Sequence, residues 1–298
     1  MTTSSRGSVA FIGLGAMGYP MAGHLLAAGY AVCVYNRTQA KAEAWVAEHI
    51  AKNAEYRVSS ASTPREAAEN KDFVFVCVGN DDDVRGVILE ADGALAGMEA
   101  GAVLVDHTTT SADLARELAA AATKAGVGFL DAPVSGGQAG AVNGKLTIMV
   151  GGDDATFAKT LDAMNVYARA TTHMGTHGAG QLTKMVNQIC IASLLQGLSE
   201  GMAFAQKAGL DGNLVLDVIS KGAAQSWQME NRGKTMLKRE FNFGFAVDWM
   251  HKDLGICLNE GARNGAKLPV TTIVDGYYQA LQKQGDGRGD TSSLIKLL

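Results

Sequence analysis

A single lysine, Lys184, stands in an otherwise apolar helical segment that begins in the run GTHGAGQLTKMVNQ of residues 175–188. Asn187 follows three positions later, so the two side chains are expected to share one face of the helix. A lysine held away from water and near a helix N-terminus should have a depressed pKa, which suits a general acid or base. The alternative is a surface lysine whose ammonium group extends into water.

A second chemical pattern is GLGAMG at residues 13–18, with the spacing G-x-G-x-x-G. It follows the apolar segment SVAFIG and opens a helical segment, and in this context the spacing predicts dinucleotide binding. Gly13 permits a tight turn, Gly15 lets the backbone approach a pyrophosphate, and Gly18 lets the helix pack on the strand. The predicted cofactor contacts in this loop are Gly13, Leu14, Gly15, Ala16, Met17 and Gly18.

The end of the second apolar segment indicates which dinucleotide is bound. An NAD site usually carries Asp or Glu there, whereas this chain has Asn36, Arg37 and Thr38. A guanidinium with neighbouring amide and hydroxyl donors suits a ribose 2′-phosphate, so the sequence favours NADP(H). If Arg37 is only a solvated residue at a helix start, NAD is accepted as well.

A third pattern is DAPVSGG at residues 131–137, after another apolar segment. Ser135, Gly136 and Gly137 are expected in a loop at the carboxyl edge of a strand. Such a loop offers backbone N–H groups and a hydroxyl to a carboxylate, with no large side chains in the way.

The elements that must position these residues change character along the chain. Up to about residue 175, short apolar strands alternate with helical segments, which predicts an α/β domain with a doubly wound sheet of Rossmann type. After Gly180 almost every segment is helical, beginning with one helix of nearly thirty residues. We therefore expect an NADP-binding domain at residues 1–176, an all-helical substrate and oligomerisation domain at residues 177–298, and a long helix joining them. Lys184 would lie at their boundary, where ligand sites are common.

Composition narrows the function further. The chain has 298 residues, 47% of them hydrophobic, and a formal charge of −4. There is no basic run to bind nucleic acid and no apolar run long enough to span a membrane. The opening MTTSSRGS has no signal-peptide pattern, which favours a cytoplasmic protein. The four cysteines are scattered in apolar contexts and are expected to be buried thiols, and no metal site is predicted.

Four motifs in this order resemble the β-hydroxyacid dehydrogenase family over essentially the whole chain. They are GLGAMGYPM, DAPVSGG, GAGQLTKMVNQ and HKDLGICLNEGARNG. The family includes 3-hydroxyisobutyrate dehydrogenases, tartronate semialdehyde reductases and glyoxylate/succinic semialdehyde reductases. The resemblance implies an oxidoreductase that transfers a hydride between NADP(H) and a small β-hydroxyacid or its semialdehyde.

The resemblance also implies residue roles. Lys184 would be the catalytic lysine, and Asn187 would fix the substrate. The residues implied to bind substrate are Ser135, Gly136, Gly137, Thr109, Asn187, Asp253 and Phe245. The further residues implied to contact the cofactor are Val78, Gly79, Asn80, Thr109 and Lys252.

Two other functions share parts of this pattern. Imine reductases have the same fold and cofactor motif but generally lack a lysine at the position of Lys184. A dinucleotide-binding scaffold without catalysis would have a degraded site, whereas Lys184, Asn187 and Ser135 are all present. The long helix has apolar residues on more than one face, and together with the resemblance this predicts a homodimer or homotetramer formed through the helical domain.

Overall fold

The computed structural model describes residues 6–298. The opening segment on which the absence of a signal peptide was predicted lies partly outside the described residues. By packing, the chain divides into two compact units, the first ending at Lys184 and the second beginning at Met185. This division falls inside helix α9 (Ala179–Lys207), later than the predicted boundary between residues 176 and 177.

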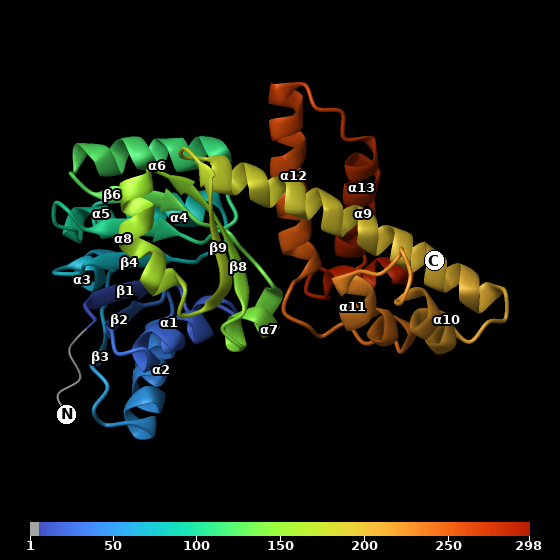
Figure 1. The fold of residues 1–298 in the computed structure, drawn as a ribbon, viewed down its shortest axis with the longest axis horizontal. Coiled ribbons are helices and arrows are strands. Elements are labelled where there is room, and N and C mark those ends of the chain that lie inside the picture. Colours follow the sequence, from blue (N-terminus) through green and yellow to red (C-terminus); the bar gives the residue numbers. More distant parts are fainter. Residues whose placement is uncertain (1–5) are drawn as a thin grey trace. The chain divides into compact units, whose positions relative to one another are not determined.

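The first unit is built on a nine-stranded sheet with the order β3-β2-β1-β4-β5-β6-β8-β7, in which β9 also pairs with β8 (Figure 1). Strands β1 to β6 are parallel throughout, whereas β8 runs antiparallel to both β6 and β7. The order reverses between β1 and β4, and ligands of open α/β sheets bind at the carboxyl ends of such a pair. The strands are β1 (Ser8–Ile12), β2 (Ala31–Tyr35), β3 (Val58–Ser60), β4 (Phe73–Val76), β5 (Val103–Asp106), β6 (Gly128–Asp131), β7 (Val134–Ser135), β8 (Leu146–Gly152) and β9 (Ala168–Gly175).

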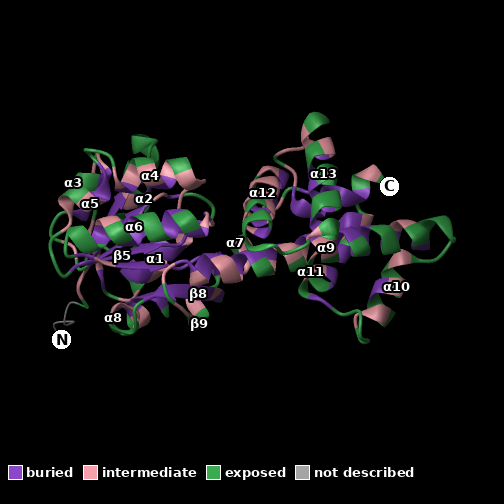
Figure 2. Ribbon diagram, turned by 90° about the horizontal axis from the view of Figure 1, so that it is seen from above, coloured by how far each residue is buried: buried purple, intermediate pink, exposed green. Residues whose placement is uncertain are grey.

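Helices cover both faces of this sheet because successive strand residues point to opposite sides. In β1, Phe11 packs into one core with α1 and α2, whereas Ile12 packs into a second core with α4 and α6. The colouring by burial in Figure 2 shows buried strands between helices whose outer faces are exposed. The helices are α1 (Gly18–Ala27), α2 (Gln39–Lys52), α3 (Pro64–Ala68), α4 (Asp81–Ile88), α5 (Ala94–Gly97), α6 (Ala112–Lys124), α7 (Gly137–Val142) and α8 (Asp154–Met164).

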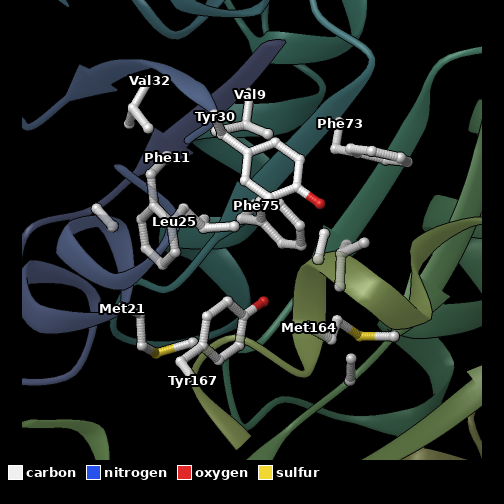
Figure 3. Packing of buried hydrophobic residues seen from close by; sticks show 14 of the residues in the cluster. Val9, Phe11, Met21, Leu25, Tyr30, Val32, Phe73, Phe75, Met164 and Tyr167 are labelled. Carbon is white, nitrogen blue, oxygen red and sulfur yellow. The ribbon is translucent and has the colours of Figure 1, made fainter. Parts of the chain in front are cut away.

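Aromatic rings organise the first of these two cores. Phe11 and Phe75, on neighbouring strands, stack with ring centroids 6.1 Å apart. Tyr167 meets the ring of Phe75 edge-on, and the side chains of Met21 and Met164 fill the space around them (Figure 3). This packing fixes β1, whose carboxyl end leads into the glycine loop, beside β4.

The second unit is helical. It contains the greater part of α9, together with α10 (Gly212–Ile219), α11 (Trp227–Leu237), α12 (Val247–Asn264), α13 (Pro269–Lys283) and the 3₁₀ segment η1 (Thr291–Leu297). Ala192 and Leu195 of α9 pack in one core with residues of α12 and α13, and Leu198 and Met202 pack in another with residues of α10 and α11. The predicted fold class, a Rossmann-type domain followed by a helical one with a long helix, is confirmed.

Two predictions need correction. The Ser135–Gly137 segment is not a simple loop, since Ser135 pairs with Thr147 across β7 and β8 and Gly137 opens α7. Not all cysteines are buried, because Cys190 is exposed on α9, although the described residues contain no disulfide bond. Among the described residues, no helix is long and apolar enough to cross a membrane.

Candidate active site

The glycine loop lies at the point where the strand order reverses. Gly13 has a φ of +99°, and a Cβ there would lie 2.2 Å from the carbonyl oxygen of Cys77, just past the end of β4. A Cβ on Gly18 would lie 2.0 Å from the carbonyl oxygen of Gly13, whereas one on Gly15 would meet no atom within 4 Å. Gly13 and Gly18 are therefore required by packing, and Gly15 leaves the backbone open to a ligand. This cradle fits the pyrophosphate of a dinucleotide at the start of α1.

Asn36 braces this loop from the end of β2. Its side-chain oxygen accepts a hydrogen bond from the N–H of Leu14 at 3.1 Å, and its amide nitrogen donates to the carbonyl of Thr38 at 3.1 Å. Thr38 precedes α2, but its side chain makes no capping hydrogen bond. The amide of Asn36 thus has a structural task in addition to the predicted contact with the cofactor.

Arg37 lies on the surface, with 88% of its side chain exposed, and pairs with Asp83 at 3.3 Å. A cavity of about 410 Å³ opens beside these two residues, between the end of β2 and α4. Its lining also includes Asp82, Glu90 and Asp92, so acidic groups outnumber the one guanidinium. Exposed ion pairs contribute little to stability, so an anionic ligand could displace Asp83 from Arg37 at small cost.

Three further predicted cofactor residues, Val78, Gly79 and Asn80, lie between β4 and α4. Asn80 caps α4 by accepting a hydrogen bond from the N–H of Asp83 at 2.9 Å. The N–H of Val78 donates to the hydroxyl of Thr108 at 3.0 Å, which ties this segment to the one that follows β5. Val78, Gly79 and Asn80 are all partly exposed at the carboxyl end of β4.

The segment after β5 carries Thr109, which is half-buried between two buried threonines, Thr108 and Thr110. The side chain of Gln181 holds both of these threonines. Its nitrogen donates to the carbonyl of Thr108 at 2.7 Å, and its oxygen accepts from the N–H of Thr110 at 3.0 Å. This segment is therefore attached directly to the first turn of α9.

The start of α9 is fixed by a buried carboxylate at the end of β6. The two oxygens of Asp131 accept hydrogen bonds from the N–H groups of Gly178 at 2.7 Å and Gln181 at 2.9 Å. Lys184 follows Gln181 by one turn and is only 7% exposed, which argues against an ordinary surface lysine. Buried lysines are rare unless their ammonium group has a partner or a function.

Gly136 and Gly137 both have positive φ, at +133° and +61°. A Cβ on Gly136 would lie 3.2 Å from the side chain of Leu146, whereas one on Gly137 would meet nothing within 4 Å. Ser135, Gly136 and Gly137 are all partly exposed. Their backbone is thus accessible, as carboxylate binding requires.

The predicted residues of the second unit form a connected polar chain. The Asn187 amide donates to the side-chain oxygen of Gln188 at 2.7 Å, and the Gln188 amide donates to Asp253 at 2.6 Å. Asp253 is 2% exposed and pairs with the ammonium group of Lys252 at 3.1 Å. Phe245 is partly buried against the core formed by α9, α12 and α13.

Buried titratable groups lie behind the site in the first unit. Burial raises the pKa of Asp106 to about 7, and the nearby Asp131 adds to this effect. Burial also raises the pKa of Asp131, against the opposing effect of its backbone hydrogen bonds. Burial lowers the pKa of His107 to about 4. The residues from 6 to 298 contain no cluster of three or more His, Cys, Asp or Glu side chains suited to a metal ion.

Three residues that organise these contacts were not predicted from the sequence. Asp131 and Gln181 lie within the quoted motifs, but nothing in their spacing reveals which backbone groups they bind. Gln188 directly follows Asn187 and resembles any polar residue of an amphipathic helix. Their roles depend on contacts between segments far apart in the sequence.

Comparison with known proteins identifies the family. Residues 8–175 match the NAD binding domain of 6-phosphogluconate dehydrogenase, and residues 178–298 match the NAD-binding domain of NADP-dependent 3-hydroxyisobutyrate dehydrogenase. The chain belongs to the 3-hydroxyisobutyrate dehydrogenase-like β-hydroxyacid dehydrogenase family. It is therefore an NAD(P)-dependent oxidoreductase of the 3-hydroxyacid dehydrogenase type.

Members of this family resemble the chain along its full length. An uncharacterised oxidoreductase of Shewanella frigidimarina is 58% identical over 290 residues, which cover 97% of each chain. A probable 3-hydroxyisobutyrate dehydrogenase-like protein of Arabidopsis thaliana, described as mitochondrial, is 44% identical over 99% of this chain and 86% of its own. The crystal structure of 3-hydroxyisobutyrate dehydrogenase from Salmonella typhimurium has a TM-score of 0.87 at 29% identity, covering 98% of this chain and 99% of that one.

Proposed function

We propose that the protein reduces a small semialdehyde or oxidises the corresponding β-hydroxyacid, with Lys184 as the general acid and base. The observation that carries this proposal is the burial of Lys184 one turn after the fixed start of α9, in the unit that also holds the glycine loop. The side chain of an ordinary surface lysine would extend into water and would not be buried in this way.

In the reductive direction, bound NADPH supplies a hydride to the carbonyl carbon. The ammonium group of Lys184 then donates a proton to the carbonyl oxygen as negative charge develops on it. In the oxidative direction the neutral amine accepts the hydroxyl proton. Nearby donors that stabilise the developing charge lower the barrier further.

The substrate carboxylate is proposed to bind at Ser135, Gly136 and Gly137. The positive φ of both glycines supports this, because such backbone turns N–H groups toward one side. Thr109 is proposed to line the site near the nicotinamide, and Asn187, Lys252, Asp253 and Phe245 keep the roles implied by the family. The proposed substrate class is thus a short carboxylate that also carries an aldehyde group, such as a small semialdehyde or glyoxylate, or the corresponding hydroxyacid.

We further propose a preference for NADP(H) over NAD(H), based on Arg37. The absence of an acidic residue at the end of β2 supports this preference. The ion pair of Arg37 with Asp83 should make the preference smaller, because a 2′-phosphate must compete with Asp83 for the guanidinium. The residues proposed to hold the cofactor are the glycine loop of residues 13–18, Asn36, Arg37, Thr38, Val78, Gly79 and Asn80.

We also propose a homodimer or homotetramer formed through the helical unit, and a cytoplasmic location. Exposed apolar side chains on α9 and α10, such as Phe204 at 72% and Leu214 at 63%, support self-association. Four cysteines that form no disulfide in the described part of the chain are consistent with a reducing compartment. Cell fractionation with a specific antibody would test the location, and recovery in an organelle would contradict it.

The first experiment measures oxidation of NADPH, with NADH in parallel, against glyoxylate, succinic, methylmalonic and tartronic semialdehydes and one cyclic imine. We expect semialdehyde turnover that is faster with NADPH. Lys184→Ala should lower kcat by about 10²–10⁴-fold, the range of a general acid, while NADPH binding changes little. If the folded variant kept most of its turnover, or only the imine reacted, the proposed role of Lys184 would be wrong.

A further inference from the structure

The side chain of Gln181 makes two hydrogen bonds to one short segment. It donates to the carbonyl of Thr108 and accepts from the N–H of Thr110, at 2.7 and 3.0 Å, and it is completely buried. These two backbone groups flank Thr109. The amide therefore grips the segment on both sides of the one threonine that is partly exposed.

The backbone of Gln181 is itself fixed by contacts with Asp131 and by close packing at Gly180. Its own N–H donates to a buried oxygen of Asp131 at 2.9 Å, so its backbone cannot shift without breaking that bond. Close packing adds to this constraint, because a Cβ on the preceding Gly180 would lie 2.5 Å from the carbonyl oxygens of Asp131 and Met149. The two hydrogen bonds to the threonine segment thus come from a residue of α9 whose backbone position is constrained.

The same turn of helix leads to Lys184. Three residues of α-helix advance by about 4.5 Å and nearly complete one turn, so the position of Gln181 sets the position of Lys184. On its other side the threonine segment is tied down by the bond from Val78 to the Thr108 hydroxyl at 3.0 Å and by the bond from the Thr108 N–H to Asp106 at 2.9 Å. Gln181 joins the two parts through its side chain.

We propose that Gln181 is a positioning residue for the reaction, which fixes the Thr109 segment relative to the helix turn that carries Lys184. This inference rests on the proposed role of Lys184. A neutral amide of this length can donate and accept at the two sites together. An ionised Glu lacks the donor, Met lacks both functions, and Asn is one carbon shorter.

The test compares Gln181→Met and Gln181→Glu with the control Gln196→Met. Gln196 is also a buried glutamine of α9, but its amide donates to Glu200, one turn along the same helix. We measure kcat, the KM for NADPH, the kinetic isotope effect with 4-deuterated NADPH, and hydrogen exchange in a peptide covering residues 104–114.

In both Gln181 variants we expect kcat to fall about 10-fold to 100-fold, with the KM for NADPH within about two-fold of the wild type. The isotope effect on kcat should rise as hydride transfer becomes slower, and the Thr110 amide should exchange at least about 10-fold faster. Gln196→Met should match the wild type in every measurement. If Gln181 only stabilised the fold, its variants would have a lower melting temperature, but kcat would not fall selectively while the KM for NADPH stayed constant.

Two outcomes would overturn the inference. One is unchanged exchange at Thr110 in the Gln181 variants, and the other is faster exchange with unchanged kcat. Failure of the proposed function would look different, since the wild type itself would turn over no semialdehyde. In that case the proposed effect of Gln181 on catalysis would be refuted together with the proposed function. Faster exchange at Thr110 would then show only that Gln181 stabilises the Thr109 segment.

Discussion

Two adjacent buried residues at the end of β5, Asp106 and His107, have pKa values shifted in opposite directions. His107 lies between a carbonyl oxygen of Ala132 at 2.6 Å and the hydroxyl of Tyr167 at 2.9 Å. A carbonyl can only accept, so Nδ1 donates to it, and in a neutral ring Nε2 then accepts from the Tyr167 hydroxyl. This arrangement agrees with the lowered pKa of His107.

The two shifts have opposite effects on stability. Burial raises the pKa of Asp106 from 3.8 to about 7, so between these values the folded state keeps a proton that the unfolded state has lost. The free energy of unfolding therefore falls as pH rises, by about 1.4 kcal/mol per pH unit. His107, with its pKa lowered from 6.5 to about 4, contributes stability that is lost as pH falls through that range. Between about pH 4 and 6.5 the two slopes nearly cancel.

Asp106→Asn removes one of these slopes and keeps an oxygen that can accept from the Thr108 N–H. We expect the difference in free energy of unfolding, variant minus wild type, to increase by about 1.4 kcal/mol for each pH unit of rise between pH 4.5 and 6. Urea denaturation across this range measures it. His107→Gln is the counterpart and should change the slope by the same amount in the opposite sense. Parallel curves for wild type and Asp106→Asn would contradict the buried, proton-bearing Asp106.

Asp83 competes with a ribose phosphate for Arg37. Asp83→Asn should lower the KM for NADPH by about two-fold to five-fold, because it removes an exposed ion pair and one negative charge. The KM for NADH should stay nearly constant. Steady-state kinetics with both cofactors at low ionic strength measures the effect. Glu117→Gln serves as the control, since this carboxylate pairs with Arg85 instead. An equal change in both KM values would show that Asp83 does not discriminate between the cofactors.

At the scale of elements, the sequence predicted those with strong periodicity. Helices α12 (Val247–Asn264) and α13 (Pro269–Lys283) lie in the part of the chain after Gly180 where almost every segment was expected to be helical. Strands β8 and β9 were not predicted. The sequence LTIMVGG of β8 lies in a glycine-rich run, and β9 has no fully buried residue and thus no apolar signal. Strand β9 pairs with β8, and β8 pairs also with β6 and β7, which lie on other segments of the chain.

The same contrast applies to the candidate site. The sequence identified the glycine loop and Lys184 as candidates, because backbone requirements and an isolated charge are visible in it, and their roles stay predictions. Asp131 and Gln181 could not be identified in this way, because their partners lie on other segments. The start of α9 is consequently where a structure adds most to the sequence.

Gly180→Ala tests how closely that start is packed. A Cβ would collide with two backbone carbonyls at 2.5 Å, so we expect a loss of stability of at least about 1–3 kcal/mol. Gly197→Ala, on the same helix, meets no atom within 4 Å and should be neutral or stabilising by up to about 1 kcal/mol. Thermal unfolding compares the two. Equal stability of both variants would mean that α9 is free to move away from β8.

At the scale of the whole molecule, the helical unit exposes several large apolar side chains to solvent. Phe204, Leu214 and Val218 are each more than 60% exposed, at 72%, 63% and 62%. Large apolar patches on a soluble domain commonly mark interfaces between proteins. These residues are the natural place to test the proposed oligomer.

Phe204→Glu should lower the mass in solution from a dimer or tetramer toward a single chain, because a carboxylate at an apolar interface would be buried without a partner. Sedimentation equilibrium measures this mass. Ile50→Glu is a matched control, since Ile50 is 47% exposed on α2 of the first unit, and this variant should keep the wild-type mass. A wild-type protein that sediments as a single chain would contradict the proposed association.

The exposed thiol of Cys190 has a practical consequence. It lies on α9 six positions after Lys184, whereas Cys33 and Cys257 are buried and Cys77 is partly buried. A maleimide fluorophore would attach first at this position without mutation of the chain. The helix that carries the proposed catalytic lysine therefore provides its own site for a spectroscopic label, through which ligand binding could be followed in real time.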